Sequence, residues 1–217
     1  MSEHHESAPV TPGGHQDHHS PPTTNRITNL AIFASGAGSN AQKIIDHFRK
    51  SSLAKIALIV SNKKEAGVVQ IAKREMIPVL LIRKEKFFDN NGYLDELEKN
   101  KIDFIVLAGF LWKIPAVLLS HYPRRIVNIH PALLPKYGGK GMYGQGVHEA
   151  VIAGKETESG ITIHYVDDKY DNGDIIMQVK CPVLPGDTPE LLAHRIHALE
   201  YANYPVVIEE LVRKMAS

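Results

Sequence analysis

Short apolar runs alternate with helix-type patterns from residue 29 onward, and this alternation predicts an α/β fold. Each run is rich in β-branched and aliphatic residues, as expected for strands that are buried on both faces of a sheet. The predicted strands are Leu30–Ala34, Lys55–Val60, Pro78–Ile82, Phe104–Ala108 and Arg125–Ile129. Strands that are joined through helices pair in parallel. The pattern therefore predicts a doubly wound, mostly parallel, Rossmann-like sheet.

The pattern changes after residue 147, where the chain predicts an antiparallel C-terminal edge. Two strand-like runs, Ile161–Val166 and Asp174–Val179, are joined by the turn-rich segment 167–173, which is typical of a hairpin. A final long helix is expected from Pro189 toward Lys214, because proline fits the first helical position. Pro205 is predicted to kink that helix.

Capping residues mark the start of two predicted helices. Ser39 is followed three residues later by Gln42, a capping-box spacing, and Thr188 precedes the proline of the last helix. The helix after Ser39 carries apolar residues at helical spacing, so one face of it should pack on the sheet. These apolar residues are Ala41, Ile44, Ile45 and Phe48.

A glycine-containing loop, residues 35–40 (Ser-Gly-Ala-Gly-Ser-Asn), joins the first strand to this helix. Free N–H groups at a helix N-terminus favour a phosphate. Residues 36–41 also match the GxGxxA pattern of dinucleotide-binding loops, but the second strand ends Val60-Ser61-Asn62-Lys63 without the acidic residue that binds the ribose hydroxyls. No Walker lysine follows the loop. We expect a phosphate monoester here, with a dinucleotide or a simple tight turn as alternatives.

A second candidate site lies at the end of the fifth strand. Asn128 and His130 are two residues apart, so both side chains point to the same face at the carboxyl edge of the sheet. A carboxamide and an imidazole together can stabilise an oxyanion and move a proton, which suits acyl transfer. Asp167, Asp168 and Asp171 are candidate partners of His130. The alternative is a polar strand end that neighbouring backbone groups satisfy.

Two further features leave their roles open. The segment 136–146 has five glycines in eleven residues, as expected for a mobile lid or equally for a plain flexible loop. His164 shares a strand face with Thr162, and it either lines the site or is a satisfied core histidine.

Composition and charge exclude several classes of protein. The 217 residues include 25 basic and 24 acidic side chains, a balance that argues against a nucleic-acid or membrane-surface partner. The longest apolar stretch, Phe104–Trp112, is too short to cross a membrane. Cys181 is the only cysteine, so an internal disulfide and a cysteine-rich zinc site are excluded. These features, and an N-terminus without a signal-type apolar region, predict a cytoplasmic protein.

The first 26 residues differ from the rest of the chain. They are rich in histidine and proline and contain few apolar residues, so residues 1–26 are predicted to form a disordered tail and residues 27–217 a single domain. The histidines of the tail could bind a metal adventitiously, but a solvated tail is the preferred interpretation.

Four segments together resemble the glycinamide ribonucleotide formyltransferases, which are folate-dependent formyltransferases of purine biosynthesis. The segments are Gly36–Asn40, Leu107–Phe110, Asn128–Lys136 and Asp171–Ile176, and the resemblance extends over about residues 28 to 214. The segment Asn128–Lys136 (NIHPALLPK) is the most specific of the four.

The resemblance implies transfer of a formyl group from the co-substrate 10-formyltetrahydrofolate to the amine of glycinamide ribonucleotide, with no metal. Asn128, His130 and Asp171 would be catalytic: Asn128 and a protonated His130 would stabilise the oxyanion, and Asp171 would keep His130 charged and relay the proton. The residues implied in phosphate and ribose binding are Gly36, Ala37, Gly38, Ser39, Asn40, His197 and Glu200. Those implied in folate binding are Leu111, Trp112, Lys113, Ile114, Asn128, Asp167, Asp168, Lys169, Tyr170 and Asp171.

Three other functions remain as alternatives. A formyltransferase that acts on methionyl-tRNA or on an amino sugar nucleotide, and a hydrolase of formyltetrahydrofolate, would use the same core. A nucleotide-binding module without catalysis would explain the glycine loop but would leave Asn128 and His130 without a role. The resemblance is compatible with a monomer and with a homodimer.

Overall fold

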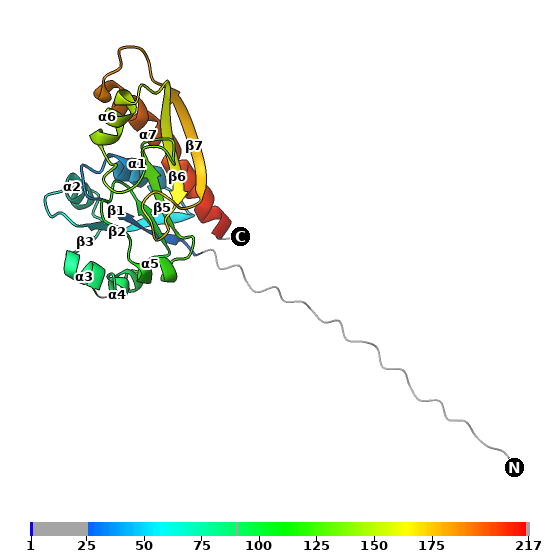
Figure 1. Cartoon of the computed structure of the whole chain (residues 1–217). Helices are drawn as coiled ribbons and strands as arrows, with labels where there is room; N and C mark the ends of the chain where they lie inside the picture. The colour runs from blue at the N-terminus through cyan, green and yellow to red at the C-terminus, as the bar shows by residue number, and fades with distance from the viewer. Residues whose placement is uncertain (2–25, 90, 216–217) are drawn as a thin grey trace.

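The computed structural model describes residue 1, residues 26–89 and residues 91–215. One seven-stranded sheet forms its centre (Figure 1). The strands are β1 Thr28–Phe33, β2 Ala54–Ser61, β3 Val79–Leu81, β4 Phe104–Leu107, β5 Ile126–His130, β6 Glu158–Tyr165 and β7 Ile175–Pro182. The helices are α1 Ser39–Phe48, α2 Gly67–Arg74, α3 Lys84–Asp89, α4 Leu94–Lys99, α5 Ala116–His121, α6 Gln145–Ala153 and α7 Pro189–Met215.

The strand order β3-β2-β1-β4-β5-β6-β7 confirms the predicted fold class. Strands β1 to β5 pair in parallel, and β6 and β7 join the sheet antiparallel. All five predicted buried strands and the predicted hairpin are present, with ends shifted by no more than a few residues. Because β1, β4 and β5 are parallel, their carboxyl ends meet at one edge of the sheet. The strand order reverses at this place, between β1 and β4.

Two hydrophobic cores lie on opposite faces of the sheet, because neighbouring residues of a strand point to opposite sides. Leu30 and Ile32 of β1 pack with apolar side chains of α1, α2 and α7. Ala31 and Phe33 pack on the other face with side chains of α3, α4 and α5. Figure 1 shows α3, α4 and α5 below β1 and β2, α1 above these two strands, and α7 running beside β6 and β7. The sheet is therefore covered on both faces, as a doubly wound fold requires.

The prediction that Ser39 and Gln42 form a capping box at the start of α1 is wrong. Gly38 is the N-cap residue, in the left-handed conformation at φ 84°, and no side chain caps the helix. Gln42 Nε2 instead donates to Asp46 and Glu75. A Cβ at position 38 would lie 2.8 Å from Val68 Cα, so the close approach of α2 imposes glycine where the helix starts.

The start of α7 agrees with the sequence. Thr188 Oγ1 accepts a hydrogen bond from the backbone N–H of Leu191 at 3.3 Å, and Pro189 is the first helical residue. Pro205 lies inside this 27-residue helix, and a kink there stays a prediction.

The structure bears differently on the predicted tail and on the expectation that no segment crosses a membrane. The predicted tail lies outside the described residues except for its two ends, Met1 and Arg26. Within the described ranges, no helix has the length and apolarity that a membrane crossing demands.

Candidate active site

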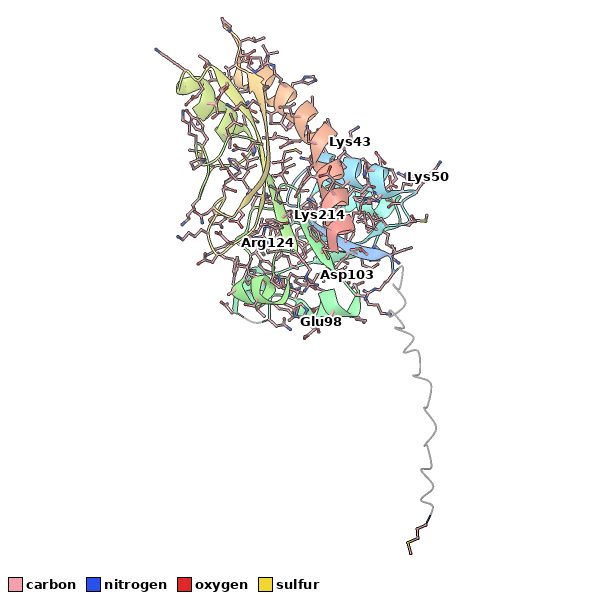
Figure 2. The ribbon with its side chains drawn as sticks, turned by 90° about the vertical axis from the view of Figure 1, so that its right-hand side faces the viewer. Lys43, Lys50, Glu98, Asp103, Arg124 and Lys214 are labelled. Atoms are coloured by element: carbon pink, nitrogen blue, oxygen red, sulfur yellow. The ribbon has the colours of Figure 1, made fainter. Side chains whose placement is uncertain are left out.

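A cavity of about 740 Å³ opens at the carboxyl ends of β1, β4 and β5. The glycine loop, residues 35–40, lines one part of it, and Asn128, His130 and Asp171 line another. Figure 2 shows Asp103 and Arg124, which precede β4 and β5, in the lower half of the molecule, whereas α6, whose residues line the cavity, lies at the top. The cavity is thus at the edge where open α/β sheets bind ligands.

Asn128 and His130 project from β5 to the same side, where both reach Asp171. Asn128 Nδ2 donates to Asp171 Oδ1 at 3.4 Å, and His130 Nδ1 lies 3.5 Å from Asp171 Oδ2. The backbone N–H of Gly139 also donates to Asp171 Oδ2, at 2.9 Å. Asp167 instead accepts hydrogen bonds from groups of its own turn. Of the three candidate carboxylates, the structure brings Asp171 to His130.

A backbone carbonyl determines which nitrogen of His130 carries a hydrogen. His130 Nε2 lies 2.7 Å from the carbonyl oxygen of Tyr137. Because a carbonyl only accepts, Nε2 is the donor, and Nδ1 is the nitrogen that faces Asp171. Tyr137 adopts a left-handed conformation at φ 55°, which turns its carbonyl toward the imidazole.

Burial lowers the pKa of His130, and the opposing effects of Asp171 and of the Tyr137 carbonyl do not compensate for it. This direction differs from the expectation that Asp171 keeps His130 charged, because the imidazole is 3% exposed and its desolvation outweighs one carboxylate. Burial would raise the pKa of Asp171, but the neighbouring His164 and His130 side chains and the Gly139 N–H together lower it. The resting site therefore pairs a neutral imidazole with an ionised carboxylate.

His164 is both buried and adjacent to the site. Its Nδ1 lies 2.8 Å from the carbonyl oxygen of Tyr165, so Nδ1 donates and Nε2 accepts. Nε2 lies 3.2 Å from Asn128 Nδ2, which therefore donates to it. This contact orients the carboxamide of Asn128, so the two interpretations of His164 from the sequence are both partly right.

The other end of the cavity contains all seven residues that the family resemblance implies in phosphate and ribose binding. The loop residues Gly36–Asn40 line it together with His197 and Glu200 of α7. Asn40 Nδ2 donates to Glu200 Oε2 at 2.9 Å, which ties the start of α1 to α7. Burial raises the pKa of Glu200 to about 7, and burial lowers the pKa of His197.

The residues predicted to bind folate surround a smaller hollow of about 50 Å³ beside Asn128 and Asp171. Its lining includes Trp112, Lys113, Ile114, Asp167, Lys169 and Tyr170. Leu111 lines the larger cavity instead, and Asp168 belongs to neither lining. The ring of Trp112 packs against Phe87 and Phe88, which holds this wall in place.

Several residues that line the cavity carry no recognisable signal in the sequence. Tyr137 contributes through its backbone carbonyl, and Lys63 and Lys140 line the cavity with positive charge. His148, on α6, also lines the cavity and is 2% exposed. Nothing in the local sequence distinguishes His148 from an ordinary helical residue. Among the described residues, no group of three histidine, cysteine or acidic side chains is arranged to hold a metal ion.

Comparison with known proteins gives a consistent result. Residues 28–208 match the formyl transferase family. Phosphoribosylglycinamide formyltransferase of Haemophilus influenzae is 36% identical over 188 residues, covering 84% of this chain and 86% of that protein. The chloroplastic enzyme of the same name from Vigna unguiculata is 45% identical over 193 residues, which is 87% of this chain. The chain spans less than two thirds of the length of this plant relative and of the one from Arabidopsis thaliana.

The solved structures agree with the sequence relatives. The crystal structure of phosphoribosylglycinamide formyltransferase from Bacillus halodurans superposes with a TM-score of 0.77 at 36% identity, covering 87% of this chain and 97% of that chain. The family match, the sequence relatives and the superposed structure each cover most of this chain. The chain therefore belongs to the formyl transferase family, among the phosphoribosylglycinamide formyltransferases.

Proposed function

We propose that this protein transfers the formyl group of 10-formyltetrahydrofolate to the primary amine of glycinamide ribonucleotide, a step of de novo purine biosynthesis. One observation carries the proposal: a single cavity holds a helix N-terminus suited to a phosphate at one end and Asn128, His130 and Asp171 at the other. A substrate with a phosphate at one end and a nucleophilic amine at the other fits this arrangement. The residues around the small hollow beside Asn128 then form the wall against which the folate ring lies.

In the proposed mechanism the amine attacks the formyl carbon. One N–H of Asn128 Nδ2 stays on His164 Nε2, and the other leaves its long contact with Asp171 Oδ1, at 3.4 Å, to donate to the oxyanion that develops. The Tyr137 carbonyl occupies His130 Nε2, so Nδ1 accepts the proton that the amine loses. Asp171 Oδ2, 3.5 Å away, stabilises the imidazolium. The new C–N bond forms, the bond from the formyl carbon to N10 of the folate breaks, and the proton passes to N10. His130 thus acts as base and then as acid.

The phosphate end supplies binding energy rather than chemistry. The backbone N–H groups at the start of α1 bind the phosphate, and Lys63 and Lys140 add positive charge to the cavity wall. Glu200 and Asn40 offer hydrogen-bonding groups to the ribose hydroxyls. A substrate anchored at this end presents its amine to His130 in a fixed orientation.

The direct test follows the folate product by absorbance, with 10-formyltetrahydrofolate and glycinamide ribonucleotide as substrates. Water alone serves as the control acceptor, and His130→Ala as the control enzyme. Turnover that requires the amine and is lost in the variant supports the proposal. Turnover with water alone would show a hydrolase, and nucleotide binding without any turnover would show a binding module.

The partners and the location belong to the same proposal. We expect the protein to bind small-molecule substrates and no nucleic acid. We expect it to be a monomer or a homodimer, and gel filtration with light scattering distinguishes the two. The plant relatives are named chloroplastic, whereas this chain is expected in the cytoplasm. Cell fractionation with an antibody against the chain tests that expectation.

A further inference from the structure

The start of α2 packs against the glycine loop that is proposed to bind the phosphate. The backbone N–H of Val68 donates to the carbonyl oxygen of Gly36 at 3.2 Å. A Cβ at Gly38 would lie 2.8 Å from the Cα of Val68. A Cβ at Gly67 would lie 2.6 Å from the carbonyl oxygen of Ala37. Three successive residues of the loop therefore contact the first two residues of α2.

The glycine at position 67 is required by the loop and not by its own helix. Gly67 is the first residue of α2, and its φ is not positive. Alanine forms helices better than glycine does, so α2 alone would favour a side chain here. The atoms that a Cβ would meet all belong to Ala37, and its carbonyl oxygen is the nearest of them. Gly67 thus leaves room for one carbonyl group of the loop.

The contacts with α2 determine where two N–H groups of the loop point. The peptide bonds of the loop are trans, so each C=O and the N–H of the next residue point in opposite directions. The carbonyl of Ala37 lies against Gly67, and the N–H of Gly38 consequently points away from α2. In the same way, the carbonyl of Gly36 faces the N–H of Val68, and the N–H of Ala37 points away.

The N–H of Gly38 is available to a ligand. Within the ranges that the structure describes, the N–H groups of Ala37 and Gly38 donate to no group of the protein. Ala37 is exposed and Gly38 is partly exposed, and both line the cavity. Gly38 is also the N-cap residue of α1, where the helix dipole favours an anion. A phosphate oxygen in the cavity can therefore reach this N–H.

We propose that Gly67 is a positioning residue for the phosphate. Because Gly67 has no Cβ, the carbonyl of Ala37 lies against α2, and the N–H of Gly38 donates to a phosphate oxygen of the substrate. This inference rests on the proposed function, of which it deepens the phosphate-binding part. It gives α2 a role in recognition although, among the described residues, the cavity lining includes none from this helix.

The first test is the variant Gly67→Ala, whose added Cβ has to push the Ala37 carbonyl away and so turns the Gly38 N–H. We expect Kd for ribose 5-phosphate, measured by titration calorimetry, and KM for glycinamide ribonucleotide both to rise about tenfold, because a hydrogen bond to a charged group weakens. Values of kcat, and of KM for the formylfolate, should stay near those of wild type. The matched control is Gly146→Ala, in the first turn of α6, where an added Cβ meets nothing within 4 Å. It should leave all four values unchanged.

A substrate without the phosphate separates positioning from general damage to the site. Glycinamide ribonucleoside lacks the group on which Gly67 is proposed to act. We expect kcat/KM for the ribonucleoside to be the same in Gly67→Ala and in wild type, whereas kcat/KM for the ribonucleotide falls about tenfold. Equal losses on the two substrates would overturn the inference, and so would an unchanged Kd for ribose 5-phosphate in a folded variant.

A measurement on the wild-type chain keeps the inference testable if the variant does not fold. When ribose 5-phosphate is added, the amide proton of Gly38 should shift downfield in the NMR spectrum, because it enters a hydrogen bond with a charged acceptor. Saturation of the protein without this shift would overturn the inference. A wild-type enzyme without turnover of glycinamide ribonucleotide, whose Gly67→Ala variant still binds ribose 5-phosphate more weakly, would overturn the proposed reaction and support Gly67 as a positioning residue for a phosphate.

Discussion

In the proposed mechanism Asn128 donates one hydrogen bond to the oxyanion oxygen, so its removal isolates one contribution to the stability of the transition state. Loss of one oxyanion donor costs about 2.7 to 4 kcal/mol in the transition state. We expect Asn128→Ala to lower kcat by about a hundredfold or more and to change KM for both substrates much less. Steady-state kinetics with circular dichroism as a check on folding measure this. A decrease of less than tenfold would exclude the oxyanion role.

The proposed role of Glu200 in binding the ribose conflicts with the stability of the fold, because its carboxyl group is buried. Its pKa is raised by burial from 4.5 to about 7, so the folded state holds a proton that the unfolded state has lost. The stability that depends on this proton is present below about pH 4.5 and is lost as the pH rises through about 7. At pH 8 we expect the free energy of unfolding of Glu200→Gln, measured by urea denaturation, to exceed that of wild type by up to about 3 kcal/mol. At pH 5 the two free energies should differ little.

The control for this prediction is substrate affinity. Glutamine keeps the shape of the side chain and an oxygen that Asn40 Nδ2 can contact, but it has no charge to offer the ribose hydroxyls. The stabilised variant should therefore bind glycinamide ribonucleotide more weakly than wild type at pH 8. A stability gain of the same size at both pH values would contradict the assignment of the raised pKa to Glu200.

At the scale of elements, Glu156, in the turn before β6, binds the side chain of Tyr137, and the backbone carbonyl of Tyr137 contacts His130. Glu156 accepts hydrogen bonds from the Tyr137 hydroxyl at 2.9 Å and from Lys136 Nζ at 2.9 Å. The end of α6 approaches so closely that a Cβ at Gly154 would lie 2.2 Å from the Tyr137 hydroxyl oxygen. A side chain at position 154 would therefore displace the tyrosine hydroxyl, and the tyrosine carbonyl in turn contacts the His130 ring.

A double-mutant cycle tests this connection. Gly154→Ala should displace Tyr137, lower kcat and reduce stability by about 1 to 3 kcal/mol, as overpacking does. Tyr137→Phe removes the oxygen that an alanine at 154 would meet, so the double variant should recover most of both losses. Urea unfolding and kcat are measured for all four proteins. Additive effects of the two substitutions would show that Gly154 acts on the site by another route.

The elements also show which features can be predicted from sequence. Buried strands and the terminal hairpin are marked by local runs of apolar residues and turns, so their ends were predicted to within a few residues. The capping box failed because contact with Val68 of α2, distant in sequence, determines the backbone of Gly38. The Tyr137 carbonyl could not be found because a left-handed tyrosine leaves no pattern in the sequence. Local signals predict elements, and tertiary contacts decide their ends.

The whole molecule assembles its site from segments far apart in the chain. Asn40 and Glu200 are 160 residues apart, and their contact at 2.9 Å depends on α7 crossing back over α1. Sequence alone could propose such residues only through resemblance to a family, because no spacing rule joins them.

The described fold, and every residue placed at the site, lie between Arg26 and Met215, which leads to a prediction about the first 25 residues. A variant that begins at Arg26 should keep the kcat and melting temperature of the full chain, because no contact used in the mechanism is removed. A variant that begins at Leu30 should melt lower. It loses Asn29, whose backbone N–H donates to Asp103 at 2.8 Å and whose side chain donates to the carbonyl of Lys101. Loss of activity in the longer variant would mean that the predicted tail contributes to the site.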